Sequence, residues 1–380
     1  MWETVKLGEV CELAYGKALD KSERLDSDGV PAFGANGIKT FAKKSLFDEP
    51  SIIVGRKGSA GEITKVNEPF WALDVTYYIK IDRDIIDLNF LFYSLTILNL
   101  PSMARGVKPG INRNDVYEKR ILLPPLAEQQ RIVAKLDAEF AEIDSAIEVA
   151  NAKEAEVQKL EGSLLSSSLG GNAMMSEIVK LGDVCDLQNG FAFKSSDYVD
   201  NSNTLNIRMS NIRPNGKFDE FHNIKFLPDN YATKYAEYKL IEGDLIIAMT
   251  DMAGNPKILG MPTIVKNLDG RAFLLNQRVG KLHKFSDEIF VPYLCHFLST
   301  LKNFYKNKGA GGLQINISKK DILSAKIRLP PLAEQQRIVA KLDAAFAEIE
   351  NANNSIIKSK ANYLALKTSI LAQELQSEAA

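Results

Sequence analysis

A long internal repeat constrains this chain more than any other feature. Residues 123–143 read LPPLAEQQRIVAKLDAEFAEI, and residues 329–349 repeat them with one change in 21 positions, Glu139 to Ala345. A second, shorter match joins residues 5–13 to residues 179–187 through the pattern Val-Lys-Leu-Gly-acidic-Val-Cys-acidic-Leu. Because both matches recur in the same order, the chain is a duplicated unit. The longer matches start 206 residues apart and the shorter ones 174, so the second copy carries 32 extra residues between them.

Each copy of the longer repeat predicts a long helix. Its Pro-Pro pair suits a first helical turn and disfavours helix just upstream, so the helices should begin near Pro125 and Pro331. Apolar residues then recur at three- and four-residue intervals, from Val133 to Leu164 and from Val339 to Ile370. A narrow seam on a helix of about 45 residues, about 65 Å long, favours packing against another long helix. The other copy is the obvious partner, although packing of each helix on its own domain is the alternative.

The segments before the helices predict globular domains. Short β-branched and aromatic runs bounded by Gly, Asn and Pro predict strands at residues 51–54, 62–66, 75–81, 204–208, 244–249 and 278–282. Helical stretches are predicted at residues 88–98 and 291–305, and glycine-rich loops follow at residues 106–112 and 309–316. Gly170 and Gly171 predict the end of the first long helix and a hinge. The predicted divisions are 1–123 globular, 124–169 helix, 170–176 hinge, 177–329 globular and 330–376 helix.

Composition limits the classes of protein. No run approaches 18 apolar residues and the first residues lack an apolar core, so we expect neither a membrane span nor a signal peptide, and a cytoplasmic location. Three cysteines, Cys11, Cys185 and Cys295, are too few for a disulfide framework and are expected to be core thiols. Residues 124–176 carry four basic and nine acidic side chains, whereas residues 177–329 carry 21 basic and 16 acidic ones. The formal net charge of −1 disfavours a nucleic-acid binder that acts alone.

Catalytic and cofactor motifs are missing from the sequence. The cluster Gly309–Gly312 follows a Lys-Asn-Lys stretch rather than an apolar strand and lacks a following Lys-Ser/Thr, so a nucleotide-binding loop is disfavoured. The three histidines, His222, His283 and His296, have no metal-ligand spacing and no nucleophile motif nearby. Neither an adenine-methyltransferase Asn/Asp-Pro-Pro-Tyr motif nor a set of nuclease carboxylates is found. We therefore expect a non-catalytic chain with no catalytic residue, no metal site and no cofactor of its own.

The globular segments instead offer residues suited to DNA. Arg, Asn and Gln can read base edges, and Lys and Ser can contact phosphates. For any one of them, a solvated side chain or a turn residue is the alternative; as a set placed twice on one frame, they favour recognition. The candidates of the first segment are Lys17, Asn36, Arg56, Lys57, Ser59, Arg105, Lys108 and Arg113, and those of the second are Gln188, Asn189, Lys194, Arg208, Asn211, Arg213, Gln277, Arg278, Lys306, Lys308 and Gln314.

The doubled Leu-Pro-Pro-Leu-Ala-Glu-Gln-Gln-Arg-Ile entry to a long helix, each time after a segment that starts Lys-Leu-Gly-acidic-Val, resembles the specificity subunit of type I restriction-modification systems. The resemblance covers nearly the whole chain. It implies an α+β fold, with two pseudo-symmetric α/β target recognition domains separated by two long antiparallel coiled-coil helices. Each domain would read one half of a bipartite asymmetric sequence in double-stranded DNA.

The resemblance also implies partners that carry the chemistry. Methyltransferase subunits would dock on this chain and methylate adenine, and restriction subunits would join for cleavage; S-adenosylmethionine, ATP and Mg would act on those partners. We expect the docking surface to include exposed residues of the repeat, because one partner must fit both halves: Glu128, Gln129, Arg131, Glu334, Gln335 and Arg337. Helix capping and pairing at the domain junction is the structural alternative for these six.

Two other classes of function remain to be weighed. An enzyme such as a fused methyltransferase-nuclease is disfavoured, because two recognition segments and two helices fill the 380 residues. A coiled-coil adaptor that does not bind DNA is disfavoured by the divergence of the two globular interiors, since a scaffold has no reason to vary only those.

Overall fold

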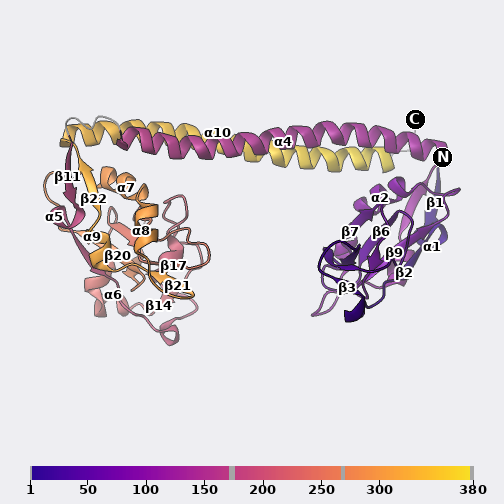
Figure 1. Cartoon of the computed structure of the whole chain (residues 1–380), viewed down its shortest axis with the longest axis horizontal. Helices are drawn as coiled ribbons and strands as arrows, with labels where there is room; N and C mark the ends of the chain where they lie inside the picture. Colours follow the sequence, from indigo (N-terminus) through magenta and orange to yellow (C-terminus); the bar gives the residue numbers. More distant parts are fainter. Residues whose placement is uncertain (1, 171–175, 267–269, 377–380) are drawn as a thin grey trace. The chain divides into compact units, whose positions relative to one another are not determined.

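The computed structural model describes residues 2–170, 176–266 and 270–376, and its contacts divide the chain into two compact units (Figure 1). Unit 1 comprises Met1–Lys153 and Ser355–Ala380, and unit 2 comprises Glu154–Asn354. The two long helices are α4 (Leu126–Gly170) and α10 (Leu332–Gln376), so each unit holds a sheet-rich part and a portion of both helices. Of the predicted hinge at 170–176, residues 171–175 lie outside the described residues.

Unit 1 is built on two four-stranded sheets and a two-stranded ribbon. The first sheet has the order β2 (Cys11–Tyr15), β9 (Thr76–Ile81), β6 (Ser51–Gly55) and β7 (Ile63–Val66); the second has β3 (Arg24–Leu25), β5 (Gly37–Ala42), β4 (Val30–Gly34) and β8 (Trp71–Ala72); the ribbon pairs β1 (Glu3–Lys6) with β10 (Arg120–Leu123). The helices are α1 (Leu7–Val10), α2 (Leu88–Ile97) and α3 (Arg113–Tyr117), with 3-10 turns η1 (Lys21–Glu23) and η2 (Leu100–Met103).

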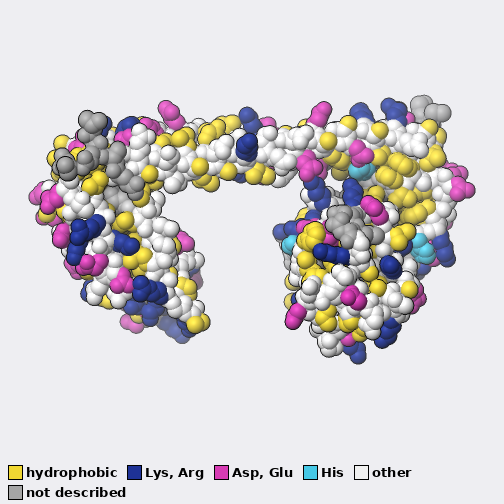
Figure 2. Space-filling view, turned by 180° about the vertical axis from the view of Figure 1, so that it is seen from behind, with side chains coloured by type: hydrophobic (Ala, Val, Ile, Leu, Met, Phe, Trp, Pro, Cys, Tyr) yellow, Lys and Arg dark blue, Asp and Glu magenta, His cyan; other side chains and the backbone are white. Residues whose placement is uncertain are grey.

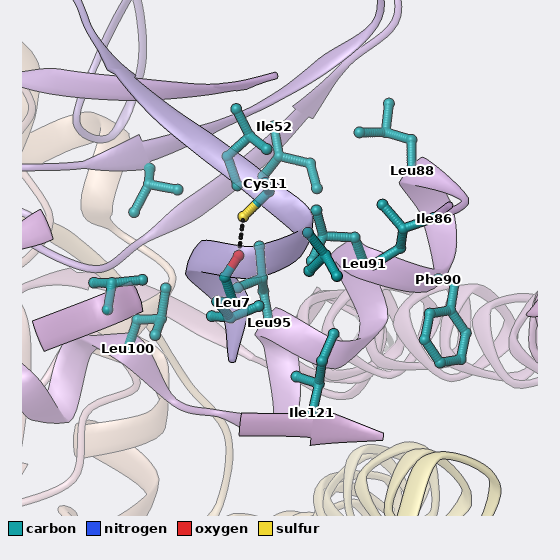
Figure 3. Packing of buried hydrophobic residues seen from close by; sticks show 14 of the residues in the cluster. Leu7, Cys11, Ile52, Ile86, Leu88, Phe90, Leu91, Leu95, Leu100 and Ile121 are labelled. Atoms are coloured by element: carbon teal, nitrogen blue, oxygen red, sulfur yellow. Dashed lines mark hydrogen bonds between the residues drawn. The ribbon is translucent and has the colours of Figure 1, made fainter. Parts of the chain in front are cut away.

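The main core of unit 1 lies where the first sheet, α2 and the long helices meet. Leu91 on α2 and Leu136 on α4 are fully buried, and Leu371 on α10 joins the same cluster. The Cys11 thiol, which Figure 3 draws among apolar side chains of this cluster that include Leu91, donates a hydrogen bond to the Leu7 carbonyl at 3.2 Å. Helix α2 starts where it does because the Asp87 side chain accepts hydrogen bonds from the first backbone N–H groups of the helix.

Unit 2 repeats this plan with an additional ribbon. Its sheets have the orders β12 (Asp186–Asn189), β20 (Val279–His283), β16 (Leu245–Ala248), β18 (Pro262–Ile264) and β14 (Phe226–Leu227), β13 (Thr204–Ile207), β19 (Ala272–Leu275), β15 (Lys239–Leu240); its ribbons pair β11 (Glu177–Lys180) with β22 (Lys326–Leu329) and β17 (Thr250–Met252) with β21 (Gln314–Asn316). The helices are α5 (Leu181–Val184), α6 (Tyr231–Lys234), α7 (Val291–Ser299), α8 (Lys302–Lys308) and α9 (Lys319–Leu323), with 3-10 turns η4 (Ser195–Asp197), η5 (Met209–Asn211) and η6 (Ala236–Tyr238).

Portions of the long helices contact each other inside each unit. In unit 1, Lys135 of α4 lies 2.6 Å from Glu374 of α10, and Asp144 of α4 lies 2.5 Å from Lys367 of α10. As the chain advances along α4 its partner on α10 moves backwards, so the pair is antiparallel. In unit 2, Leu169 at the end of α4 shares a core cluster with Leu342 near the start of α10, again an antiparallel arrangement.

The predicted long helices and strands are confirmed. Helices α4 and α10 begin one residue after Pro125 and Pro331, and each of the six predicted strands is present, with bounds that differ by one residue at most. The predicted helical stretch 291–305 is two helices, α7 and α8, separated at Thr300 and Leu301. One residue of the predicted seam is misplaced, because the Leu160 side chain is 57% exposed. No helix of the described residues is long and apolar enough to cross a membrane.

Candidate nucleic-acid interface

An aromatic ring with two guanidinium groups marks the strongest candidate surface of unit 1. The Arg113 and Arg56 guanidinium carbons lie 4.8 and 5.4 Å from the centroid of the Tyr15 ring, which is within cation–π range. Arg56 donates two hydrogen bonds to the Asp74 carbonyl, and Arg113 donates one to the Leu13 carbonyl at 3.3 Å. The buried Nε of Arg113 has no hydrogen-bond partner. Both guanidinium groups are thus held in place with donor capacity left for a ligand.

Backbone hydrogen bonds join the loop after β6 to the glycine-rich loop. Ile111 N donates to Arg56 O at 3.0 Å, Gly58 N donates to Pro109 O at 2.9 Å, and both Lys57 and Arg105 pair with Gly110. These bonds gather six predicted residues on one surface: Arg56, Lys57, Ser59, Arg105, Lys108 and Arg113. Lys17 lies two residues after Tyr15, and its backbone N–H donates a hydrogen bond to the Ala72 carbonyl. Asn36 lies elsewhere, in the turn between β4 and β5.

The corresponding surface of unit 2 is the ribbon of β17 and β21. Its glycine-rich loop is closed by two reciprocal hydrogen bonds between Ala310 and Asn316, at 3.0 and 2.9 Å. Lys306 and Lys308 end the helix that enters this loop, and Gln314 leaves it opposite Met252. The structure therefore brings three predicted residues, Lys306, Lys308 and Gln314, to one edge of unit 2.

Four further predicted residues of unit 2 lie in or next to strands of its first sheet, two in β12 and two directly before β20. The Gln188 amide donates to the Glu237 carbonyl at 2.8 Å, and Asn189 is exposed at the end of β12. Gln277 and Arg278 are exposed in the turn between β19 and β20, where Met249 N donates to Arg278 O at 2.9 Å. Because Met249 precedes β17 directly, Arg278 lies beside the ribbon that carries Gln314. Lys194 is exposed before the 3-10 turn η4.

The loop after β13 corrects one expectation. Asn211 is 2% exposed, because its side-chain amide donates to the Asp219 and His222 carbonyls and its oxygen accepts from Arg208 N. It organises the loop and does not face a ligand, so its prediction as a DNA contact is wrong. Arg208 donates to the Asn223 carbonyl, and the Arg213 guanidinium lies 3.9 Å from the Asp219 carboxylate.

The repeated motif at the start of each long helix carries an identical ion pair. Arg131 binds Glu128 through two hydrogen bonds of 2.8 and 2.7 Å, and Arg337 binds Glu334 in the same way at 2.7 Å each. The hydrogen bonds from the arginines hold the pKa of both glutamates below their usual range. The arginine side chains are 60% and 68% exposed, so each unit presents the same charged pair on its helix surface.

Gln129 and Gln335 were expected to be exposed beside these pairs, and that expectation is wrong. Both are fully buried. The Gln129 amide donates to the carbonyls of Pro124 and Ile85 and accepts from Asp87 N, the residue that caps α2. Gln335 makes the equivalent three bonds, to Pro330 O, Glu288 O and Phe290 N. Each glutamine thus fastens a long helix to the helix that covers its sheet-rich part.

Two of the three cysteines lie in the cores of the units. Cys11 and Cys185 are buried in the two main cores, as expected, and burial raises the pKa of both thiols to about 12, while Cys295 is half-buried. Among the described residues no group of three or more His, Cys, Asp and Glu side chains could hold a metal ion.

On the face drawn in Figure 2, Lys and Arg side chains lie on both sheet-rich parts and are interspersed with acidic ones.

Comparison with known proteins identifies the family. A family model described as the type I restriction modification DNA specificity domain matches residues 1–158 and 175–359. The chain belongs to this family. It is 29% identical over 378 residues to the type I restriction enzyme MjaVIII specificity subunit of Methanocaldococcus jannaschii, which covers 90% of this chain and 85% of that protein. It is 28% identical over 425 residues to the EcoKI specificity subunit of Escherichia coli strain K12, covering 99% and 89%.

Solved structures agree in fold. A chain from a study of complex assembly and conformational transition of the type I R-M system has a TM-score of 0.73 at 21% identity, covering 98% of this chain and 97% of the other. The HsdS subunit of Thermoanaerobacter tengcongensis has a TM-score of 0.51 at 21% identity, covering 100% and 97%. This specificity subunit is therefore a non-catalytic, DNA-recognising member of a type I restriction-modification system with the expected α+β fold.

Selection of polar residues alone missed two features of these surfaces. Tyr15 lies two residues before the candidate Lys17, and its ring is the platform for Arg56 and Arg113. Val107 and Leu313, at the tips of the two glycine-rich loops, are 105% and 89% exposed. An aliphatic residue among glycines in both copies was the available signal.

Proposed function

We propose that each unit of this specificity subunit reads one half of a bipartite DNA sequence through its glycine-rich loop and the neighbouring strand ends. The observation that carries the proposal is the duplicated frame. The ribbons β1–β10 and β11–β22 have the same register, from Glu3 opposite Leu123 and Glu177 opposite Leu329, while the loops at the opposite edge differ in sequence. A shared frame with different loops is what two readers of different half-sites require.

The remaining candidate residues fit this role in kind. Arg56 and Arg113 in unit 1, and Gln314 in unit 2, have side chains that can bond base edges, and Lys57, Lys108, Lys306 and Lys308 can neutralise phosphates. The modest net charge of −1 is consistent with partners that supply part of the DNA clamp.

Methyltransferase subunits are the partners proposed for the helices, with Glu128–Arg131 and Glu334–Arg337 in the docking surface. Adenine methylation with S-adenosylmethionine would occur on those subunits, and restriction subunits would add ATP- and Mg-dependent cleavage. The purified chain, incubated with S-adenosylmethionine and target DNA, should therefore transfer no methyl group. Transfer by the chain alone would contradict this division of labour.

A segment exchange tests the proposal. Residues 177–328 are replaced by the matching segment of another family member, and the modified sequence is mapped by methylome sequencing of cells that carry the partner subunits. One half of the recognised sequence should change and the other should stay, because the exchanged segment starts and ends in the ribbon β11–β22 that both copies share. A pattern that changes in both halves would contradict one reader per unit.

We further propose that the long helices set the spacer between the half-sites. Duplication of residues 155–158 adds four helical residues, about 6 Å along the axis. At about 3.4 Å per base pair this corresponds to at most about two base pairs. Methylome sequencing should show a spacer lengthened by about one or two unspecified base pairs, with both half-sites unchanged. New half-sites with the original spacer would mean that the helices are not the ruler.

A further inference from the structure

The two most exposed large hydrophobic side chains of the described residues occupy the tips of the two glycine-rich loops. Val107 is 105% exposed and Leu313 is 89% exposed, whereas the next in order, Ile178, is 61% exposed. The loops have diverged in sequence and differ in length by one residue between their closing pairs, yet each keeps one aliphatic side chain at its end. A feature retained in both copies through this divergence indicates a function that the two units share.

Both loops are built to hold that side chain away from the core. Arg105 and Gly110 close the first loop with two reciprocal backbone hydrogen bonds of 3.0 Å, and Ala310 and Asn316 close the second. A further bond braces the second tip, from Ala253 N to Leu313 O at 3.1 Å. Glycine is required beside the second tip, because a Cβ on Gly311 would lie 2.0 Å from the Gln314 carbonyl oxygen. These bonds close the base of each loop, and in unit 2 they also hold the residue at the tip.

Cationic side chains flank both tips and indicate the kind of molecule that meets them. Arg105 and Lys108 lie on either side of Val107, and Lys306 and Lys308 end the helix that leads to the loop of Leu313. An exposed aliphatic side chain surrounded by cations suits the stacked bases between two phosphate backbones. Apolar wedges of this kind enter base steps and unstack them in many DNA-distorting proteins.

The shared tip chemistry argues for distortion rather than sequence reading. A contact to a thymine methyl group would specify one base at one position. Two units that read different half-sites have no reason to share it, whereas unstacking of a base step is independent of sequence. Methylation of an adenine requires that the base leave the stack, and that step has an energetic cost which local unstacking lowers.

We propose that Val107 and Leu313 are apolar wedges, each of which enters a base step of the half-site read by its own unit and assists extrusion of the target adenine into the methyltransferase subunit. This inference rests on the proposed function. Each wedge acts on its own half-site, so the two can be inactivated separately.

The test uses the full chain assembled with its methyltransferase subunits and a duplex with the mapped target. 2-Aminopurine replaces the target adenine in one half-site at a time, and its fluorescence rises when the base leaves the stack. Val107→Ser should reduce that rise about tenfold in the half-site of unit 1, reduce the methylation rate of the same half-site on the adenine duplex about tenfold, and leave the other half-site unchanged. Leu313→Ser should show the reverse, and Val107→Leu, which keeps an aliphatic tip, should behave as the unaltered chain.

The possible outcomes distinguish a failure of the wedge proposal from a failure of the proposed DNA recognition. If the unaltered complex shows no specific binding, the proposed function itself fails. If it binds and both serine variants give the full fluorescence rise, the wedge is overturned and recognition stands. Deoxyuridine in place of the half-site thymines provides the last arm: a Val107→Ser effect that disappears on this DNA identifies a thymine-methyl contact and also overturns the wedge.

Discussion

The two units place different side chains on nearly the same backbone. In unit 1, Arg56 N donates to Val75 O, and Arg56 O accepts from Ile111 N. In unit 2, Met249 makes the equivalent two bonds: its N donates to Arg278 O, and its O accepts from Ile317 N. The strand registers extend this equivalence, because Glu12 faces Lys80 as Asp186 faces His283. At the three positions of the cation–π cluster, Tyr15, Arg56 and Arg113 of unit 1 correspond to Asn189, Met249 and Lys319 of unit 2.

The difference shows which part of the molecule is free to change. Met249 is 7% exposed and belongs to the core, and Lys319 lies 2.5 Å from Asp186, so unit 2 has no counterpart of the two guanidinium groups on Tyr15. The helix junctions behave in the opposite way, since Gln129 and Gln335 make the same three hydrogen bonds. At the positions compared, the residues of the loop edge thus differ between the units, whereas the helix junction is the same in both.

The largest effect is expected from breaking the conserved junction. Gln129→Ala leaves the part-buried N–H of Asp87 and the carbonyls of Ile85 and Pro124 without their partner. At about 1–3 kcal/mol for each unsatisfied group, partly relieved by water, we expect a loss of about 3 kcal/mol in the free energy of unfolding. Gln335→Ala should lose a similar amount. Denaturant unfolding followed by circular dichroism measures both losses.

The neighbouring glutamines of the motif supply the matched control. Gln130 and Gln336 are exposed, so their replacement by alanine should change the free energy of unfolding by less than about 0.5 kcal/mol. A clear loss for Gln129→Ala with none for Gln335→Ala would show that the two junctions, alike in geometry, are not alike in energy. The two helix junctions would then contribute differently to stability, although they make the same hydrogen bonds.

Substitutions at the variable edge are expected to weaken DNA binding more in unit 1 than in unit 2. Arg113→Ala removes a guanidinium held 4.8 Å from the Tyr15 ring and should weaken binding to the half-site of unit 1 by about 1–3 kcal/mol. The matched variant, Lys319→Ala, should have a smaller effect on the half-site of unit 2, because Lys319 is already paired with Asp186. Competition binding of the assembled complex with duplexes altered in one half-site measures each effect. Equal losses in both units would show that the two edges read DNA in the same way.

Features that depend on neighbouring residues in the sequence were predictable, whereas those that depend on contacts between distant residues were not. The Pro-Pro pairs are local signals, and the long helices begin one residue after Pro125 and Pro331, as expected. The burial of Gln129 depends on Ile85 and Asp87, more than 40 residues away, and a glutamine in a charged stretch gives no sign of it. Asn211 is of a residue type suited both to bases and to turns, and only the positions of the surrounding carbonyls decide between them.

The candidate surface was predictable in its members and not in its grouping. The glycine-rich loops and the basic residues near them are visible in the sequence, and six of the eight candidates in unit 1 come together. The contact of Arg113 with Tyr15 joins positions about a hundred residues apart, one on α3 and the other on β2. No periodic pattern encodes such a contact.

The smallest expected effect concerns the repeated ion pair, where the comparison predicts equality between the units. Arg131→Glu combined with Arg337→Glu should leave the fold intact, because both side chains are more than half exposed, and should weaken co-purification with the methyltransferase subunit. Lys153→Glu with Lys358→Glu, exposed cations of the same helices outside the repeat, is the matched control. Its co-purification should be unchanged.

A charge-swapped variant separates docking from a structural role of the pair. Adding Glu128→Arg and Glu334→Arg to the double reversal restores both ion pairs with opposite polarity. If the pairs serve only to hold the start of each helix, the swap should restore co-purification along with the junction. If the partner recognises the positions of the charges, the swap restores the ion pair but not the docking. We expect this second result, because the same motif lies in the same orientation at the start of both helices.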